Sequence, residues 1–203
     1  PYVSGNVSLY NETAEGAIPP TPVLMGIGIV EDIRKCVTSD MKNKGDIWIV
    51  GKSEEQMGAS LYYRTQGINC PNVPTTDFDS FIPRMEQLIE AIESGEVSAC
   101  HDVSTGGIAL AVIEMCMGGV GAKINLSGDM RDDLELFSES NGRWIVQVKP
   151  EFEETFSNRF DFARKIGHVD KDISFNLSKG EEVRFSIDEL RKIWTDPLWK
   201  RLA

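Results

Sequence analysis

The chain is poor in the side chains that build thiol or histidine chemistry. Its 203 residues include four cysteines, which lie far apart without a CxxC pair, and two histidines. A zinc site needs several such ligands close together, so this composition argues against one and favours reduced, buried thiols. His101 has no second histidine at metal-ligand spacing, and the HExxH pattern of zinc proteases is absent.

Long apolar runs and an excess of positive charge are also missing. No apolar run approaches the roughly 18 residues of a membrane span, and we read no signal peptide. Lysine and arginine number 21 against 32 acidic residues, and the net charge of −11 argues against nonspecific nucleic-acid binding. We expect a cytoplasmic chain with neither membrane nor nucleic-acid partners. Because the chain opens at Pro1 inside what reads as a structured segment, we also expect a fragment or a processed chain.

Strand-like and helix-like segments alternate along the chain. Expected strands cover residues 23–30, 47–50, 97–103, 120–126, 144–148, 173–177 and 181–187. Expected helices cover residues 55–67, 77–95, 108–119, 132–137, 151–160 and 188–202, the last broken before Pro197. In the clearest helix, Phe81, Met85, Leu88 and Ile92 share one face. This alternation predicts an α/β fold, a mixed sheet with packed helices.

Two glycine-rich segments follow strand-like stretches. The Gly-Lys-Ser that ends GDIWIVGKS is not a P-loop, because the five residues between Gly45 and Gly51 form the strand itself, where the motif has a loop of four. The segment HDVSTGG lies between a strand and a helix. There Ser104 or Thr105 can cap the helix, and the two glycines let backbone approach a ligand. A plain capped turn is the alternative.

Glu139, in the segment LFSESNGRW, leaves a choice open. A lone carboxylate before a strand can act as a general base, but it more often accepts hydrogen bonds at a cap or turn. Residue type therefore favours a cap for Glu139. Neither Glu139 nor His101 receives an assigned role.

The segment SGNVS, near the start of the chain, offers polar groups at alternating positions. If Val7 points into a core, Asn6 and Ser8 share the exposed face. An Asn carbonyl oxygen suits Mg²⁺, a Ser hydroxyl can bind a phosphate or a sugar, and Gly5 would let a nucleotide touch the backbone. A polar surface turn is the alternative.

Four segments, taken in order, resemble one enzyme family. They are SGNVSLYNE, IPPTPVLMGIGIVED, HDVSTGGIALAVIEM and LFSESNGRWIV. In this order and spacing they are similar to the phosphoribosylformylglycinamidine synthase subunit II family, within the aminoimidazole ribonucleotide synthetase superfamily. The resemblance runs over nearly the whole chain and weakens beyond Pro150.

The resemblance implies an ATP-dependent ligase of purine biosynthesis. Such a ligase converts formylglycinamide ribonucleotide (FGAR), ATP and glutamine-derived ammonia into the amidine, ADP and phosphate. It implies a C-terminal-type α/β domain at residues 35–203, preceded at 1–34 by the last segment of a barrel-forming domain. Carried over by motif, Gly5 matches a glycine that contacts ATP, Asn6 an asparagine that binds Mg²⁺, and Ser8 a serine that binds the ribonucleotide.

The family's catalytic histidines, ATP-binding lysine and acidic Mg²⁺ ligands belong to its first half. The resemblance therefore implies no catalytic residue here, and we expect this chain alone to be inactive. Its implied partners are the missing N-terminal portion, a glutaminase subunit and a small bridging subunit. Glu139, Ser140 and Asn141 look like the duplicate of a substrate-binding Glu-Ser-Gln motif with Asn in place of Gln, so they are not assigned to substrate.

Two alternatives stay open. The chain could come from another ATP enzyme of the superfamily, such as aminoimidazole ribonucleotide synthetase, selenophosphate synthetase, thiamine-phosphate kinase or a hydrogenase-maturation protein. It could also be a non-catalytic interaction module. A module should hide the apolar residues 23–30, whereas a piece of a larger enzyme should expose them.

Overall fold

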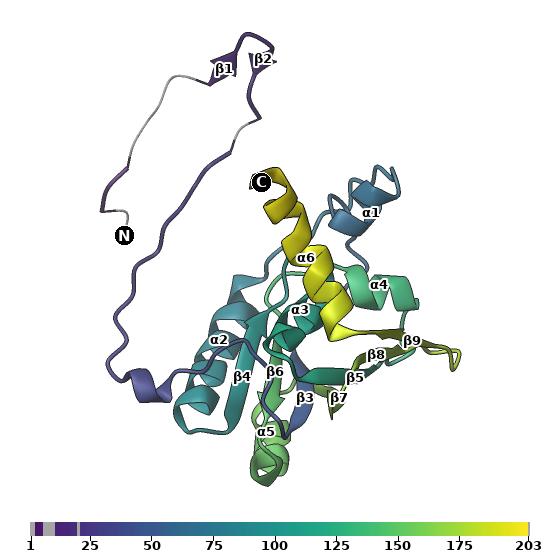
Figure 1. Cartoon of the computed structure of the whole chain (residues 1–203). Coiled ribbons are helices and arrows are strands. Elements are labelled where there is room, and N and C mark those ends of the chain that lie inside the picture. The colour runs from purple at the N-terminus through teal and green to yellow at the C-terminus, as the bar shows by residue number, and fades with distance from the viewer. Residues whose placement is uncertain (1–2, 6–10, 20, 203) are drawn as a thin grey trace. The chain divides into compact units, whose positions relative to one another are not determined.

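The chain forms two compact units, Pro1–Glu31 and Asp32–Ala203. The computed structural model describes residues 3–5, 11–19 and 21–202, with backbone alone for residues 198, 199, 201 and 202. In the first unit, β1 (Glu12–Thr13) and β2 (Gly16–Ala17) pair antiparallel across a turn (Figure 1). That residues 1–34 end a barrel-forming domain stays a prediction.

The apolar stretch 23–30 is exposed and forms no strand. Its large side chains are between 60 and 94% exposed. The prediction of a buried strand here is wrong, because a strand needs a neighbour to pair its backbone and to cover its apolar side chains. Within the described residues this stretch has neither. Its exposure is the outcome expected for a piece of a larger enzyme.

The second unit is built on a seven-stranded sheet with the order β4-β6-β3-β7-β5-β8-β9. Its strands are β3 (Asp46–Val50), β4 (Val97–Asp102), β5 (Gly121–Asn125), β6 (Trp144–Val148), β7 (Ala163–Asp170), β8 (Ile173–Asn176) and β9 (Glu182–Phe185). β5 and β8 pair parallel, and the other neighbouring strands pair antiparallel. At the outer edge of β4, Thr38 forms an isolated parallel bridge with Ala99.

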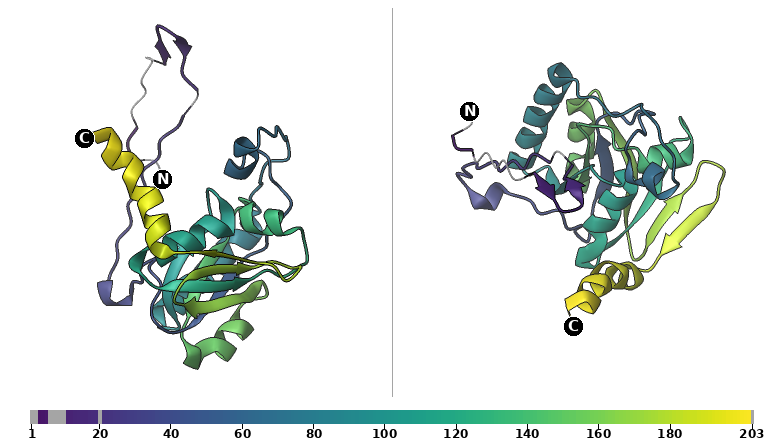
Figure 2. Two further views of the ribbon diagram at one scale, coloured as in Figure 1. Left: turned by 45° about the vertical axis from the view of Figure 1, so that its right-hand side comes forward. Right: turned by 90° about the horizontal axis from the view of Figure 1, so that it is seen from above.

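Helices pack on both faces of the sheet, so the unit has two cores. The helices are α1 (Leu61–Thr65), α2 (Phe78–Glu93), α3 (Gly107–Met115), α4 (Asp132–Phe137), α5 (Glu153–Arg159) and α6 (Ile187–Leu202). The larger core joins α3 and the start of α6 to one face, and the smaller core joins α2 and α5 to the other (Figure 2). β3 feeds both cores, because Ile47 and Ile49 point to the first and Trp48 and Val50 to the second.

α2 lies within the predicted range of residues 77–95, and both of its ends have clear boundary signals. The Asp77 carboxylate accepts a hydrogen bond from the Asp79 N–H at 3.1 Å, and Gly95, with φ of 82°, follows the last turn. Leu88 lies in the core as expected, whereas Met85 is 36% exposed.

Elements of the second unit also differ from the prediction, and α1 is shorter than the expected helix at residues 55–67. β7 was not foreseen, although it lies in the middle of the sheet between β3 and β5. α6 does not break before Pro197 but continues to Leu202. No helix in the described part of the chain is long and apolar enough to cross a membrane.

Candidate functional site

One end of the sheet gathers the loops that carry the sequence motifs. Val50 at the end of β3 pairs with the first residues of β6 and β7, and Asp102 at the end of β4 pairs with Trp144 at the start of β6. The loops after β3 and β4 therefore meet the loop before β6. Loops held at one end of a rigid sheet are a frequent place for a ligand site.

Arg143 ties these loops together from inside. Its side chain is buried and donates to the carbonyl oxygens of Ser138 at 2.6 Å and Ser140 at 3.0 Å, and to the Ser53 hydroxyl at 2.7 Å. Burial lowers the pKa of the Arg143 guanidinium to about 10, and the charge of Glu54 acts in the opposite direction. Through these three hydrogen bonds Arg143 holds the loop before β6 to the loop after β3.

Glu139 accepts hydrogen bonds from the starts of two helices. Its Oε1 atom lies 2.8 Å from the Leu61 nitrogen at the first turn of α1 and 2.9 Å from the Gly106 nitrogen before α3. The predicted capping by Ser104 or Thr105 is wrong, because Gly106 occupies the N-cap position with φ of 80° and has no side-chain cap. The carboxylate from the neighbouring loop accepts the N–H instead. Glu139 therefore acts as a cap.

The two residues after Glu139 are also connectors. The Ser140 hydroxyl accepts from the Glu54 N–H at 2.9 Å and lies 3.2 Å from the Glu54 carbonyl oxygen, to which it donates. Asn141 donates from its amide to the Thr76 hydroxyl at 2.8 Å. Each of the three residues thus fixes a loop.

His101 lies between two carboxylates. Its Nδ1 atom is 3.3 Å from a carboxylate oxygen of Asp102 and 2.7 Å from the Asp102 carbonyl oxygen, and its Nε2 atom is 3.1 Å from a carboxylate oxygen of Glu114 in α3. Within the described parts of the chain, no three or more His, Cys, Asp and Glu side chains are arranged to hold a metal ion. The ring therefore joins the end of β4 to α3.

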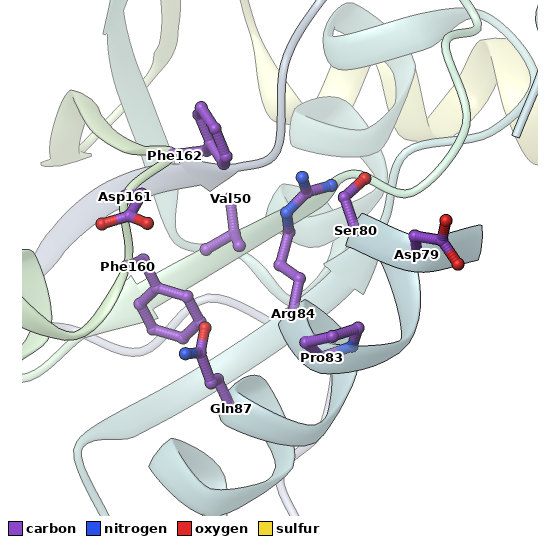
Figure 3. A pocket seen from close by; sticks show the side chains of 9 residues that line it. All are labelled: Val50, Asp79, Ser80, Pro83, Arg84, Gln87, Phe160, Asp161 and Phe162. Atoms are coloured by element: carbon purple, nitrogen blue, oxygen red, sulfur yellow. The ribbon is translucent and has the colours of Figure 1, made fainter. Parts of the chain in front are cut away.

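Two cavities open at the same end of the sheet. The first, of about 190 Å³, lies between α2 and the loop before β7, with Arg84 and Ser80 on one wall (Figure 3). The second, of about 310 Å³, lies beside the loop after β3 and includes Lys52 and Ser53. Phe162 lines both cavities. Sequence reasoning missed Arg143, Arg84 and these cavities.

Comparison with known proteins identifies the domain. Residues 43–178 match the family described as AIR synthase related protein, C-terminal domain, and this range is more than half of the chain. The chain belongs to that family.

Curated relatives extend the AIR synthase related match to nearly the whole chain. Phosphoribosylformylglycinamidine synthase subunit PurL of Thermoanaerobacter sp. is 37% identical over 202 residues, which cover 96% of this chain and 28% of the relative. The same subunit of Methanothrix thermoacetophila is 36% identical over 208 residues, with 98% of this chain and 27% of the relative covered. The resemblance predicted from the four segments is confirmed. The chain spans less than a third of the length of these relatives.

Solved structures share the AIR synthase related fold. Thermotoga maritima PurL complexed with FGAR has a TM-score of 0.64 at 20% identity, covering 78% of this chain and 30% of that chain. Hydrogenase maturation protein HypE in complex with ATP has a TM-score of 0.54 at 15% identity, covering 84% of this chain and 55% of that chain. At such identities the likeness concerns the fold, and the expected mixed α/β sheet with packed helices is confirmed.

The three residues assigned by resemblance lie in the first unit. Asn6 and Ser8 are outside the described residues. Gly5 is described, and a Cβ atom placed on it would meet no atom within 4 Å. Its φ is not among the positive values that favour glycine. Neither packing nor turn geometry in the described chain thus requires glycine at this position.

Proposed function

We propose that this chain is the C-terminal part of a phosphoribosylformylglycinamidine synthase, the ligase that forms an amidine from FGAR, ammonia and ATP. The observation that carries the proposal is the identity of 37% over 96% of the chain to a PurL subunit. The ordered segments SGNVSLYNE and HDVSTGG support it. We further propose that the protein works in the cytoplasm, with the rest of its subunit, a glutaminase subunit and a small bridging subunit as partners.

The exposed stretch 23–30 supports this proposal over a self-contained interaction module. A module folds with its apolar residues covered, because exposed apolar area of this extent favours association. Here the side chains of Val23, Ile27 and Ile29 are more than 85% exposed. A further part of the same enzyme would cover them.

We propose that Gly5, Asn6 and Ser8 contribute one side of the ligand site. Gly5 fits a position approached from outside the chain, because the described residues near it leave open space. Asn6 offers an amide oxygen, the hard ligand that Mg²⁺ accepts, and Ser8 offers a hydroxyl to the ribonucleotide. The described residues hold no metal cluster of their own, so the remaining Mg²⁺ ligands would come from elsewhere in the enzyme. Bound Mg²⁺ would shield the phosphate charge of ATP.

The proposal also divides the work between the two units. Residues 1–34 would end a barrel-forming domain and carry the ligand-contacting turn, and residues 35–203 would form the C-terminal-type domain. In the latter, Arg143 and Glu139 hold the loops at one sheet end in fixed positions. Such a preorganised surface suits one wall of an active site.

The test is a chimera in which this chain replaces the aligned region of the Thermoanaerobacter PurL subunit. We expect the chimera to form amidine and ADP from FGAR, ATP and ammonia, and this chain alone to form none. A folded chimera without ATP-dependent amidine formation would overturn the proposal. Product formation by this chain alone would refute its assignment as an incomplete part.

Two variants of the chimera test Asn6 and Ser8, and a third serves as the control. Asn6→Ala should raise the Mg²⁺ concentration needed for half-maximal activity, and Ser8→Ala should raise KM for FGAR. Asn11→Ala is the matched control, because Asn11 lies in the same segment, is exposed and has no proposed role. Equal effects of all three substitutions would contradict the assigned roles.

A further inference from the structure

Phe162 is a half-exposed aromatic ring shared by the two cavities, and two basic side chains approach it. The Lys52 Nζ atom lies 4.1 Å from the ring centroid and the Arg84 Cζ atom 5.4 Å from it. Lys52 lines the larger cavity and Arg84 the smaller one. The ring attracts both cations through its π face.

Neither cation has an acidic partner. Among the described residues, no carboxylate oxygen lies within 4.0 Å of the Lys52 ammonium or the Arg84 guanidinium. Arg84 donates one hydrogen bond, from Nη1 to the Gly142 carbonyl oxygen at 3.1 Å. A guanidinium carries five N–H donors, so most of its capacity remains unused.

Several other described cations, such as Lys44 and Arg64, also lack a carboxylate partner. The net charge is −11, and the two cations near the start of β7 are paired: Arg164 with Glu135, and Lys165 with Asp46 and Glu153. Of the three cations that line the two cavities, Lys52 and Arg84 are therefore the two without a carboxylate partner.

The acidic residues near the cavities do not neutralise the two cations. In Figure 3 the carboxylates of Asp79 and Asp161 lie on opposite sides of the Arg84 guanidinium, and both point away from it. In the larger cavity, Glu135 is buried and engaged by Arg164 and by the backbone and hydroxyl of Ser127. Asp129 and Asp161 are the other two carboxylates that line this cavity.

We propose that Lys52 and Arg84 bind an oxyanion of the phosphate type at the rim of Phe162. The Lys52 Nζ and Arg84 Cζ atoms lie 4.1 and 5.4 Å from the centroid of the same ring, so the distance between these two atoms cannot exceed the sum of these values. A phosphate group that accepts one charge-assisted hydrogen bond of about 2.8 Å from each cation spans about 8 Å. Small movements of the two side chains would therefore let both cations contact the same phosphate group. The larger cavity, which Ser53 also lines, leaves room for a group attached to the phosphate.

The proposal gives the Gly-Lys-Ser sequence a phosphate-binding role, although the sequence is not a P-loop. Gly51 donates its N–H to the Phe162 carbonyl oxygen at 2.8 Å, which places Lys52 beside the aromatic ring. No helix follows directly, and the phosphate contacts are made by side chains. The site depends on this chain alone and is independent of the proposed synthase activity.

The test is calorimetric titration of the 203-residue chain at low ionic strength with inorganic phosphate and, separately, with AMP. Lys52→Gln and Arg84→Gln should each weaken binding at least tenfold. Lys44→Gln should change it less than twofold, because Lys44 is exposed and lies at the opposite end of β3. Arg84→Lys, which keeps the charge, should retain more affinity than Arg84→Gln, and unfolding midpoints show that each variant is folded.

The two ligands identify the source of the anion. Tighter binding of AMP than of phosphate, with the same loss in both variants, shows that the phosphate is carried by a nucleotide. Equal binding of both ligands shows a site for the phosphate group itself. No saturable binding of either ligand, or equal affinity in Lys52→Gln, Arg84→Gln and Lys44→Gln, overturns the proposal.

Discussion

Replacing Glu139 by alanine should loosen two helices at once. One carboxylate oxygen accepts the N–H groups of Leu61 and Gly106 at 2.8 and 2.9 Å. A hydrogen bond to a charged acceptor contributes about 1.5–3 kcal/mol, and Glu139 is only partly buried, so the lower value applies. The loss of both bonds should lower the free energy of unfolding by about 3 kcal/mol.

Glu139→Gln should cost less than Glu139→Ala. The glutamine side chain keeps a carbonyl oxygen in the same place but loses the charge, which roughly halves the strength of such bonds. We expect a loss of about 1–2 kcal/mol, measured by urea unfolding followed by circular dichroism. Glu55→Ala is the matched control, since Glu55 is exposed on the adjacent loop and its side chain makes no hydrogen bond among the described residues.

One result would refute this reasoning. If Glu139→Ala and Glu55→Ala unfold at the same urea concentration as the unsubstituted chain, the two hydrogen bonds do not hold the helices. The carboxylate would then need another role, and general-base chemistry would return as an explanation for Glu139.

Two further predictions concern the buried thiols of Cys100 and Cys116 and the space around two glycines. Burial raises the pKa of the Cys100 and Cys116 thiols to about 12, with the Asp102 charge adding to the shift at Cys100, so neither thiol should react with Ellman's reagent at pH 8 until the chain unfolds. Unfolded thiols lose their protons at about pH 8.5, so the free energy of unfolding should fall as pH rises from there toward 12, by up to about 1.4 kcal/mol per pH unit for each thiol. Replacing both cysteines by alanine should flatten this slope. An unchanged slope would contradict the raised pKa values of the two thiols. Gly107→Ala should destabilise the chain far more than Gly180→Ala in thermal unfolding, because both have positive φ but only at Gly107 would the new Cβ lie 2.5 Å from a backbone carbonyl oxygen. Equal melting temperatures of these two variants would contradict that packing.

The fold was predictable where apolar residues repeat with one period. β3 and β6 are short apolar runs, and α2 carries its apolar residues at helical spacing. β7 escaped prediction because Arg164 and Lys165 interrupt its apolar pattern, and their charges are balanced by acids from distant segments. α6 continues past Pro197, and the carbonyl oxygen that loses its helical hydrogen bond there belongs to Ile193, a residue that is 69% exposed.

The sequence predicted a part of the site only where the chemical type of a single residue favours one role over another. A capping role for Glu139 was favoured from its place before a strand, and the structure confirms it. Arg143 carried a weak signal, as a charged residue entering an apolar strand. The arrangement of Lys52, Arg84 and Phe162 carried none, because it brings together three segments that are far apart in the sequence. The roles of Gly5, Asn6 and Ser8 stay predictions.

The bridge between Thr38 and Ala99 lets the segment before β3 cover part of the open edge of the sheet at β4. An outermost strand offers unpaired backbone groups to any passing chain, and such edges start aggregation. At β4 the Thr38 carbonyl accepts the Cys100 N–H at 3.1 Å, so part of that edge is already occupied. A shortened chain that began after Thr38 would keep all seven strands of the sheet but would expose this edge. We expect such a chain to self-associate through β4.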